Sequence, residues 1–568
     1  MYRHLKKLLT GVLSLTVLCA AAMPSMALDG TGNVASVDGQ EYATVQEAIN
    51  KGNGKTVTLL DDAKENVVIP EGATVTLDLG TFTLANDGAS HTITNKGTLT
   101  IQGSGKVDNE NHGKAALWNE GTAVLNGGTF DRSKEAGSSA EASGSNSYYT
   151  VVNHGNMTIN DGVTITQNGK FSSLLENGWY NGAENKSGQP SVLTIKGGTF
   201  SGGLNTIKND DYGELIVEGG TFTNVAQAAL LNWNEAEISG GDFQADEGSS
   251  CVILNGYLDD TMDAGKLTIT GGTFTGGDST DALNTMGGSS NSGNIQISGG
   301  TLNGDIVLGA ASNSAAGTLA ISGSAVVNGS VTNTKKDNVT ISGGSVAGEV
   351  SNSGDGSTSI TGGAFAQKPA DEYIGGASAV AKYQVAGGAA AYYIGEESIN
   401  QAAANAESGS TIEVLKGDVK LDITADDVIV KNSGDGDVTV NDQDVPAGDE
   451  GVVTHTHKAE KKEAKEATCT ETGNQEYWYC AGCGKYFSDE ALTKEISKED
   501  IIIPATGTTS SKPEDTSKPG DPTSSNSENS NRPQTGETSQ FTLWVALLVL
   551  AGGSFAGVAL SRSKRKAS

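Results

Sequence analysis

A short pattern of alternating apolar and polar residues recurs along most of the chain. It consists of an apolar–polar–apolar triplet, one further residue, Gly-Gly, and then Thr-Phe or a related pair. Clear copies occupy residues 193–200, 215–222, 236–243, 267–274, 295–302 and 339–346. Weaker copies occupy residues 99–107, 124–130, 157–165, 319–326 and 359–365. Because the alternation has a period of two residues, it predicts β-strands rather than helices.

The spacing of the copies indicates how these strands are arranged. Successive turns lie between 19 and 36 residues apart. The shorter spacings are too small for a propeller blade of about 40 residues and fit one coil of a parallel β-helix. In that fold each strand pairs with the equivalent strand of the next coil, about 4.8 Å away. Alternate side chains such as Leu193 and Ile195 would fill a shared core, and Gly-Gly would form a sharp corner.

An asparagine ends the strand that precedes most copies. These residues are Asn95, Asn119, Asn153, Asn209, Asn232, Asn255, Asn284, Asn333 and Asn352. Stacked asparagine side chains can hydrogen-bond along a stack, so the column predicts a structural ladder. With these repeats, about residues 40–450 resemble the right-handed parallel β-helix proteins related to pectate lyases. The resemblance implies an all-β, right-handed parallel β-helix solenoid, but fold alone does not specify a reaction.

Two segments with a helical pattern accompany the repeats, at residues 42–49 and 398–405. A helix before the first strand would cap an end coil that otherwise exposes its core and unpaired backbone. We therefore predict a β-helix with an N-terminal cap over residues 28–375. Residues 376–450 would form a second short β-helix segment or a cap.

Both ends of the chain are typical of an exported protein. Residues 1–27 combine two lysines, an apolar run and small residues before the expected cut, which predicts a secretory signal peptide. Residues 541–560 form an apolar stretch long enough to cross a membrane, and a basic tail follows it. Residues 505–531 contain almost nothing apolar and predict a disordered Ser/Thr/Pro spacer.

A pentapeptide precedes the transmembrane stretch: Arg532, Pro533, Gln534, Thr535 and Gly536. Its order before the apolar stretch and basic tail, over residues 532–568, resembles the cell-wall sorting signal of Gram-positive surface proteins. The family motif is Leu-Pro-x-Thr-Gly, so Arg532 departs from it and leaves the class of sortase open. The resemblance implies that a sortase cuts after Thr535 and joins Thr535 to peptidoglycan. We therefore expect a secreted protein on the cell wall and cell surface of a Gram-positive bacterium.

Charge narrows the choice of partner. The chain carries 68 acidic and 37 basic residues, a formal net charge of −31. Such an acidic excess argues against nucleic-acid binding, which requires Lys and Arg to neutralise phosphates. It is compatible with divalent cations, because clustered oxygens bind calcium. The candidate calcium ligands are Asp210, Asp211, Asp259, Asp260, Asp263, Asp278 and Asp281.

The longer coils carry insertions, around residues 131–150, 166–190, 244–266 and 275–294. Several aromatic residues lie on or near them: Tyr148, Tyr149, Trp179, Tyr180, Trp233 and Tyr257. Flat aromatic rings stack on sugars, so these residues predict a site for glycans or host glycoproteins. The alternative is that they only cover the core.

The β-helix resemblance also suggests where to look for catalysis. Calcium-dependent pectate lyases pair aspartates with a basic residue, and Arg132 is the only arginine between residues 28 and 531. Hydrolases of this fold use aspartates, Gly-His-Gly and a basic triplet. Residues 209–211 and 153–155 echo the first two elements, and the triplet is absent. We name no catalytic residue and prefer an adhesin. The alternatives are a polysaccharide lyase or glycoside hydrolase, and a scaffold without a ligand.

Residues 451–504 contain a separate Cys/His module. Cys469, Cys480 and Cys483 follow His455 and His457, and three thiolates with one imidazole suit tetrahedral zinc. We predict a structural zinc site formed by His457, Cys469, Cys480 and Cys483. A disulfide with one remaining thiol is the alternative in an exported chain. The stretch resembles small Cys-bearing modules of Firmicute surface proteins.

Overall fold

The computed structural model describes residues 32–506, except 112, 136, 138–147, 181, 247, 257–264, 286–292, 310–315, 377, 454–458 and 482–483. The predicted signal peptide, nearly all of the predicted spacer and the predicted sorting signal therefore lie outside the described residues. So does the apolar stretch at 541–560. Within the described ranges, no helix is both long and apolar enough to cross a membrane. The chain divides into two compact units, residues 1–296 with 300–318 and residues 297–299 with 319–568, which are described separately.

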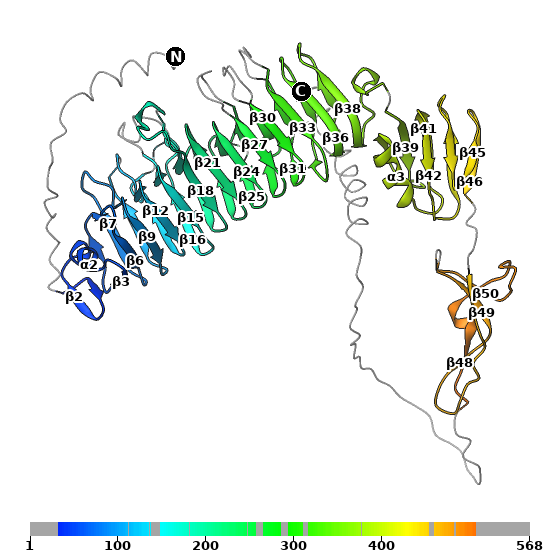
Figure 1. Cartoon of the computed structure of the whole chain (residues 1–568), viewed down its shortest axis with the longest axis horizontal. Coiled ribbons are helices and arrows are strands. Elements are labelled where there is room, and N and C mark those ends of the chain that lie inside the picture. The colour runs from blue at the N-terminus through cyan, green and yellow to red at the C-terminus, as the bar shows by residue number, and fades with distance from the viewer. Residues whose placement is uncertain are drawn as a thin grey trace, which may run out of the picture. The chain divides into compact units, whose positions relative to one another are not determined.

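The first unit is a parallel β-helix in which each coil contributes three strands, so that equivalent strands form three stacks (Figure 1). The first stack contains β3 (Lys55–Leu59), β6 (Thr74–Asp78), β9 (Thr98–Gln102), β12 (Thr122–Leu125), β15 (Asn156–Ile159), β18 (Ser191–Ile195), β21 (Gly213–Val217), β24 (Glu235–Ile238), β27 (Lys266–Ile269) and β30 (Asn294–Ile297). The second contains β4 (Ala63–Lys64), β7 (Thr83–Asn86), β10 (Lys106–Asn109), β13 (Gly128–Asp131), β16 (Val163–Gln167), β19 (Thr199–Gly202), β22 (Thr221–Asn224), β25 (Asp242–Ala245), β28 (Thr273–Gly276) and β31 (Thr301–Asn303).

The third stack contains β5 (Val67–Ile69), β8 (Ile93–Asn95), β11 (Leu117–Asn119), β14 (Val151–Asn153), β17 (Leu175–Asn177), β20 (Asn205–Asn209), β23 (Ala228–Asn232), β26 (Cys251–Asn255), β29 (Asp281–Thr285) and β32 (Ile306–Leu308). Its strands pair in parallel with the equivalent strands of the neighbouring coils. The prediction of an all-β parallel β-helix is confirmed.

The repeated pattern explains the core of the first unit. Leu193 and Ile195 of β18 are in register with Leu215 and Val217 of β21, and all four are buried. Four phenylalanines of the repeats stack inside the coil, with neighbouring ring centroids 4.4–5.0 Å apart: Phe200, Phe222, Phe243 and Phe274. Alternation thus places one apolar layer above another along the whole stack.

Both glycines of a corner are required, for different reasons. A Cβ on Gly240 would lie 2.2 Å from the Glu218 carbonyl oxygen of the preceding coil. Gly241 has φ of 101°, in the region that favours glycine. A residue with a side chain can therefore replace either glycine only if the coil shifts.

The asparagine ladder is present, with two corrections. Side-chain amides connect six successive pairs at 2.7–2.9 Å, through Asn95, Asn119, Asn153, Asn177, Asn209, Asn232 and Asn255. Asn177 belongs to the ladder although the sequence did not single it out. Asn284 does not belong to it, because Thr285 is the residue in register with Asn255. Asn284 donates instead to Asp281 of its own strand.

The start of the first unit is capped as the helical pattern predicts. Helix α2 (Val45–Lys51) begins after Thr44, whose hydroxyl accepts from the Glu47 N–H, and it buries Val45, Ala48 and Ile49. Strands β1 (Ala35–Val37) and β2 (Gln40–Tyr42) pair antiparallel, and β1 also covers the edge of β3. A short 3₁₀ helix, η1 (Gly182–Glu184), lies in a later inserted segment.

The second unit begins with further coils and ends in mixed and antiparallel sheets. Its coil strands are β33 (Thr318–Ile321), β34 (Val326–Val327), β35 (Val331–Asn333), β36 (Asn338–Val346), β37 (Val350–Asn352) and β38 (Thr358–Phe365). They are followed by η2 (Asp371–Tyr373), β39 (Val380–Gln384), β40 (Ala390–Ile394), α3 (Glu396–Ala404), β41 (Thr411–Lys416), β42 (Val419–Leu421), β43 (Val428–Asn432), β44 (Val438–Val440), β45 (Gln443–Val445) and β46 (Glu450–Val453). Helix α3, at the second helical pattern, packs Ile399 and Ala403 into the core of this part.

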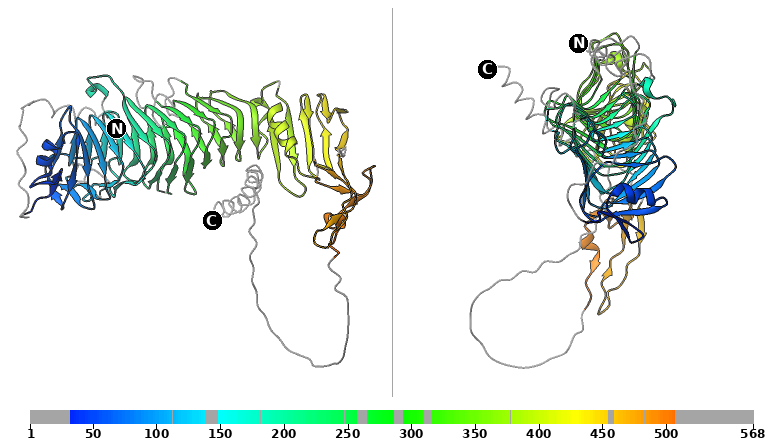
Figure 2. Two further views of the ribbon diagram at one scale, coloured as in Figure 1. Left: turned by 60° about the horizontal axis from the view of Figure 1, so that its bottom comes forward. Right: turned by 90° about the vertical axis from the view of Figure 1, so that its left-hand side faces the viewer.

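The Cys/His module forms small antiparallel sheets at the end of the second unit. It contains β47 (Ala459–Lys462), β48 (Gly473–Asn474), β49 (Tyr477–Cys480), β50 (Tyr486–Phe487), β51 (Glu495–Ile496), α4 (Lys498–Ile501) and β52 (Ile502–Ile503). These short strands are coloured orange in Figure 1 and in Figure 2.

Candidate functional site

One row of side chains on the outside of the third stack forms the base of the candidate site. The residues directly before the ladder asparagines are in register: Trp118, Val152, Glu176, Lys208, Leu231 and Leu254. Because successive side chains of a strand alternate and the asparagines are buried inside, this row faces away from the coil. Outward positions are usually exposed, yet Val152, Glu176 and Lys208 are buried. Other parts of the chain therefore cover them.

Six side chains from four neighbouring coils form what we call the aromatic platform: His91, Trp118, Tyr148, Tyr149, His154 and Trp179. The Trp118 ring lies 4.5 Å from that of His91 and 4.6 Å from that of His154. His154 in turn stacks on Trp179 at 3.8 Å, with 14° between the ring planes. Tyr148 lies 6.4 Å from Trp118 and 5.4 Å from Tyr149. The rings form one connected surface across the strands.

Beside the platform lies what we call the charged cluster: Glu176, Lys208, Asp210 and Asp211. Glu176 and Lys208 are neighbours on β17 and β20. Lys208 Nζ forms an ion pair with Asp210 and lies over two rings, 4.6 Å from the centroid of Tyr180 and 4.2 Å from that of Trp233. Asp211 accepts from the Gly182 N–H at 3.0 Å, which connects the cluster to the segment after Trp179.

Burial shifts the pKa values of Glu176 and of the two histidines in opposite directions, and in each case it favours the uncharged form. The pKa of Glu176 is well above its usual range, because burial and the nearby Asp210 both disfavour its charged form. Burial lowers the pKa of His154 to about 4 and that of His91 to about 3. Burial therefore favours the protonated form of Glu176, and both imidazoles of the platform are uncharged at neutral pH.

Three buried polar atoms at the site have no hydrogen-bond partner among the described residues: His154 Nδ1, Trp179 Nε1 and Glu176 Oε1. An unsatisfied buried polar atom costs about 1–3 kcal/mol, so such atoms are rare in native proteins. The rings around these atoms are partly exposed, while the three atoms themselves are buried. Tyr180, next to Trp179 in the chain, is the most open of these rings, with 54% of its surface exposed.

Arg132 holds the segment that contains Tyr148 and Tyr149 in place by hydrogen bonds to the backbone. Its guanidinium is buried and donates to the Tyr148 and Asn111 carbonyl oxygens, each at 2.6 Å. Buried Glu135 lies 3.1 Å away and balances its charge. Arg132, the only arginine between residues 28 and 531, thus connects segments of the platform and does not belong to a solvent-exposed basic patch.

The structure brings together five of the six aromatic residues proposed from sequence: Tyr148, Tyr149, Trp179, Tyr180 and Trp233. Tyr257 lies outside the described residues. Trp233 is also structural, because it packs on a small outer cluster formed by Ala228, Leu231, Cys251 and Leu254. Cys251 is buried there, as expected for a small apolar residue.

Sequence reasoning missed Trp118, Glu176 and Lys208 as parts of this site. A signal was present, because each directly precedes a ladder asparagine and the ladder fixes the register. His91 carried no comparable signal, since it precedes β8 and reaches Trp118 only through the folded coil.

The candidate calcium ligands are partly described. Asp210 and Asp211 are engaged with Lys208 and with the Gly182 N–H. Asp281 accepts from Asn284 at 2.7 Å, while Asp259, Asp260 and Asp263 lie outside the described residues. No group of three or more His, Cys, Asp or Glu side chains is arranged to hold a metal in the described part of the chain. Calcium stays a prediction.

The zinc prediction is likewise open, because His457 and Cys483 lie outside the described residues. Cys480 is buried at the end of β49, and Cys469 is exposed. The Gly484 N–H donates to the Cys480 carbonyl at 2.8 Å, and the Cys480 N–H donates to the Lys485 carbonyl at 3.0 Å. These two hydrogen bonds fix the backbone of Cys480 at the start of the Cys-x2-Cys segment.

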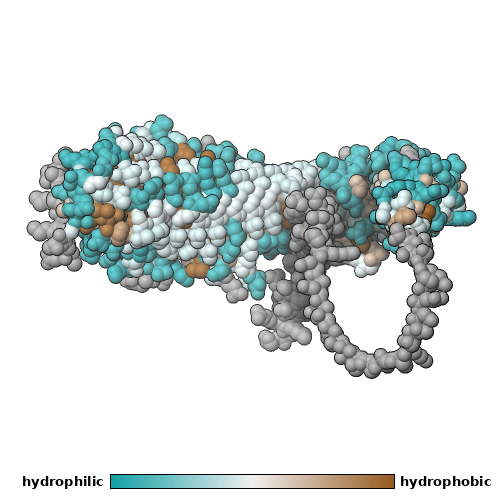
Figure 3. Space-filling view, turned by 90° about the horizontal axis from the view of Figure 1, so that it is seen from below, coloured by the Kyte–Doolittle hydropathy of each residue, from teal (hydrophilic) through white to brown (hydrophobic). Residues whose placement is uncertain are grey.

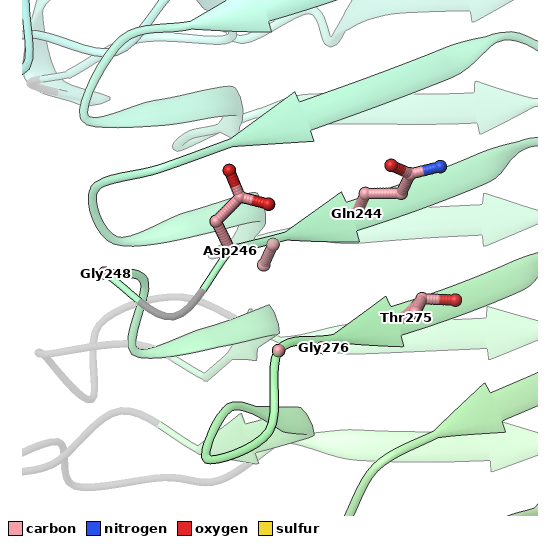
Figure 4. Close-up of a pocket in the computed structure, with 7 residues that line it drawn as sticks. Gln244, Asp246, Gly248, Thr275 and Gly276 are labelled. Carbon is pink, nitrogen blue, oxygen red and sulfur yellow. The ribbon is translucent and has the colours of Figure 1, made fainter.

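A pocket of about 430 Å³ lies elsewhere in the first unit, between β25 and β28. Figure 4 shows Gln244 and Thr275 on neighbouring strands and Asp246 at the strand end. Among the described residues that line it, Asp246 is the one ionisable side chain and none is aromatic. The pocket therefore lacks the rings and convergent polar groups that distinguish the platform.

Surface apolarity does not single out a competing site. The face seen in Figure 3 is mostly hydrophilic or neutral. Among the described residues, the exposed large apolar side chains are Leu60, Phe171, Tyr180, Val452 and Ile502. Comparison of the chain with protein-family models, curated proteins and solved structures finds no match.

Proposed function

We propose that this protein is a surface adhesin that binds glycans, free or on host glycoproteins, through the aromatic platform. The observation that carries the proposal is the gathering of six aromatic side chains from separate coils on one outer face. A soluble coil needs no such surface, since its core is already filled by the apolar repeats. Ring faces stack on the C–H faces of sugars, and nearby polar atoms bind hydroxyl groups.

The proposed location supports this role. By the resemblance of residues 532–568 to sorting signals, a sortase would join Thr535 to peptidoglycan, and the spacer would extend the folded part from the cell wall. The signal peptide would be removed on export. This anchoring can be checked directly, because muramidase should release the protein from cells with a cell-wall fragment attached to Thr535.

Glycan binding is tested with the mature chain on a glycan and glycoprotein array. Trp118→Ala and Tyr180→Ala should each weaken retention about tenfold or more, in line with loss of one aromatic contact. Trp478→Ala is the matched control, because it removes a partly buried tryptophan of the Cys/His module. Retention unchanged in both platform variants would overturn the proposal. Failure to bind any glycan or glycoprotein, with folding intact, would favour a scaffold.

A polysaccharide-cleaving enzyme is a second candidate, favoured by Glu176 and Asp210. A protonated acid beside a carboxylate is the pair that glycosidic hydrolysis uses. However, Glu176 is 2% exposed and Asp210 is fully buried, so a substrate would reach them only if covering segments moved. Release of reducing ends or unsaturated products from a bound glycan, lost in Glu176→Gln while binding persists, would establish the enzyme. Binding without product would exclude it.

A further inference from the structure

We propose that the aromatic platform selects uncharged glycans and disfavours polymers of uronic acids. This inference rests on the proposed function and names the class of ligand for that site. The inference follows from two observations. The buried cations beside the platform already form ion pairs, and the charged cluster contains more acids than bases.

Two cations beside the platform, Lys208 and Arg132, are buried and paired. Lys208 is 6% exposed, pairs with Asp210 and lies over the Tyr180 and Trp233 rings. Arg132 is 1% exposed, pairs with Glu135 and donates to two carbonyl oxygens. Turning either cation toward a ligand carboxylate would break a buried ion pair, which is strongly destabilising.

The fixed charges of the site favour the opposite sign. In the charged cluster, one lysine faces two aspartates, even with Glu176 protonated. On the platform, Glu120 accepts from Trp118 Nε1 at 2.9 Å, and the amine of Lys96, 3.5 Å away, offsets its charge. A polymer with one carboxylate per sugar would meet net repulsion here.

The histidines do not reverse this balance. His91 and His154 take protons only near pH 3 and pH 4, far below neutral pH, because burial disfavours their charged forms. Two more exposed cations lie near the platform. Lys96 is 3.5 Å from Glu120, which offsets its charge. Lys114 is partly exposed and its charge acts on His91, and one such charge cannot match a repeating anion.

The groups of the aromatic platform that lie nearest a ligand are uncharged. The rings supply flat apolar faces, and the two buried atoms without partners beneath them, His154 Nδ1 and Trp179 Nε1, belong to uncharged rings. A hydroxyl or acetamido group would pair with these atoms only if the rings shifted to expose them, and it would introduce no charge.

The experiment compares two sets of soluble probes of matched length with the mature chain, by calorimetry at low and physiological salt. The neutral set is cello-, manno- and chito-oligosaccharides, and the acidic set is oligogalacturonates. We expect at least one neutral series to bind about tenfold or more tightly than the acidic series. Its affinity should change little with salt, because no ion pair forms on binding.

Lys114→Gln serves as the internal control and should leave neutral binding unchanged. Tighter binding of oligogalacturonates, weakened by salt and by Lys114→Gln, would overturn the inference. If that binding were also lost in Trp118→Ala, the platform would remain a glycan site with acidic specificity. Binding of neither series would overturn this inference and, if the array were also negative, the proposed function.

Discussion

Arg132 shows how one residue can organise a site without contacting a ligand. It joins the segment that ends at Asn111 to the segment that begins at Tyr148, through two short hydrogen bonds to carbonyl oxygens. Its pKa is lowered to about 10, mainly by burial, and it is still charged at neutral pH. A planar guanidinium can reach two acceptors at once, whereas an ammonium is a compact point charge.

Arg132→Lys should therefore weaken glycan binding and lower the thermal midpoint. Arg132→Met should do more, because it breaks the buried ion pair with Glu135, at a cost of about 3–5 kcal/mol in the free energy of unfolding. Arg132→Met combined with Glu135→Leu should recover part of that stability but not the affinity. Calorimetric titration and thermal unfolding separate the two effects. Equal affinity of Arg132→Lys and the parent would show that Arg132 does not position Tyr148.

The histidines of the platform predict a dependence of stability on pH. In the unfolded chain they would take protons near pH 6.5. In the folded chain their pKa values are about 3 and about 4. Their contribution to stability is therefore complete above about pH 6.5 and is lost as pH falls toward the folded values. His91→Gln with His154→Gln should flatten the fall of the urea midpoint in this acidic range.

Glu176 should act in the opposite direction. Its folded pKa is raised, so its contribution is complete below the unfolded value of about 4.3 and is lost as pH rises through the folded value. Glu176→Gln should therefore gain stability relative to the parent as pH increases. If the midpoints of the parent and Glu176→Gln kept a constant difference from pH 4 to pH 8, Glu176 would not be titrating as an isolated buried acid.

At the scale of elements, the asparagine ladder holds neighbouring coils of the third stack together. The Asn177 amide donates to Asn209 Oδ1 and to the Glu214 carbonyl, while its own Oδ1 accepts from Asn153. Asn177→Ala leaves buried partners on both sides unsatisfied, so we expect a loss of about 2–4 kcal/mol in the free energy of unfolding.

Asn160→Ala is the matched control for the ladder. Asn160 also joins two coils, by a 2.7 Å bond to Asn126, but that bond is exposed. Its loss should change the free energy of unfolding by no more than about 0.5 kcal/mol. Equal effects of the two substitutions in chemical denaturation would show that burial does not set the strength of the ladder.

The strands could be predicted from the sequence because their determinants are local. Alternation, glycine corners and terminal asparagines repeat within each coil, and they were sufficient to identify the parallel β-helix. The misplaced Asn284 shows the limit of that reasoning. Residue identity pointed to Asn284, but the register of β26 with β29 brings Thr285 to the ladder position.

Only aromatic residues of the candidate site could be predicted from the sequence, and its charged residues could not. The aromatic residues stood out because aromatics are scarce and lie near insertions. Glu176 and Lys208 did not, because a polar residue at an outward position of a strand is normally a solvated one. They are 32 residues apart in sequence and become neighbours only through the pairing of β17 with β20. Their burial depends on covering segments, which no strand pattern encodes.

The zinc prediction for the Cys/His module implies that the thermal stability of the module depends on bound metal. If His457, Cys469, Cys480 and Cys483 bind zinc, the purified module-containing chain should carry about one zinc per molecule. A chelator should then lower the thermal midpoint of the module, and Cys480→Ser should abolish the metal. A disulfide would instead give two thiols fewer in a denaturing thiol assay and no response to the chelator.

At the scale of the first unit, the coil repeat sets the direction in which a glycan would lie. Ring contacts follow β8, β11, β14 and β17, and Tyr180 and Trp233 continue the surface over β20 and β23. With about 4.8 Å per coil, the distance from β8 to β23 is roughly 24 Å. One coil step is comparable to one sugar residue in an extended chain. A linear glycan across the strands would therefore meet about one coil per sugar.

This geometry predicts a length threshold. Affinity for neutral oligosaccharides should rise stepwise from disaccharide to about pentasaccharide or hexasaccharide and then level off, because further sugars extend beyond the rings. Trp118→Ala should shorten the series by removing contacts at one end, and Trp233→Phe, which keeps a ring over Lys208, should leave it nearly unchanged. Calorimetry with size-fractionated oligosaccharides measures this. If a single terminal sugar bound as tightly as the hexasaccharide, only one coil would contact the ligand and the rings of the other coils would serve to cover the charged cluster.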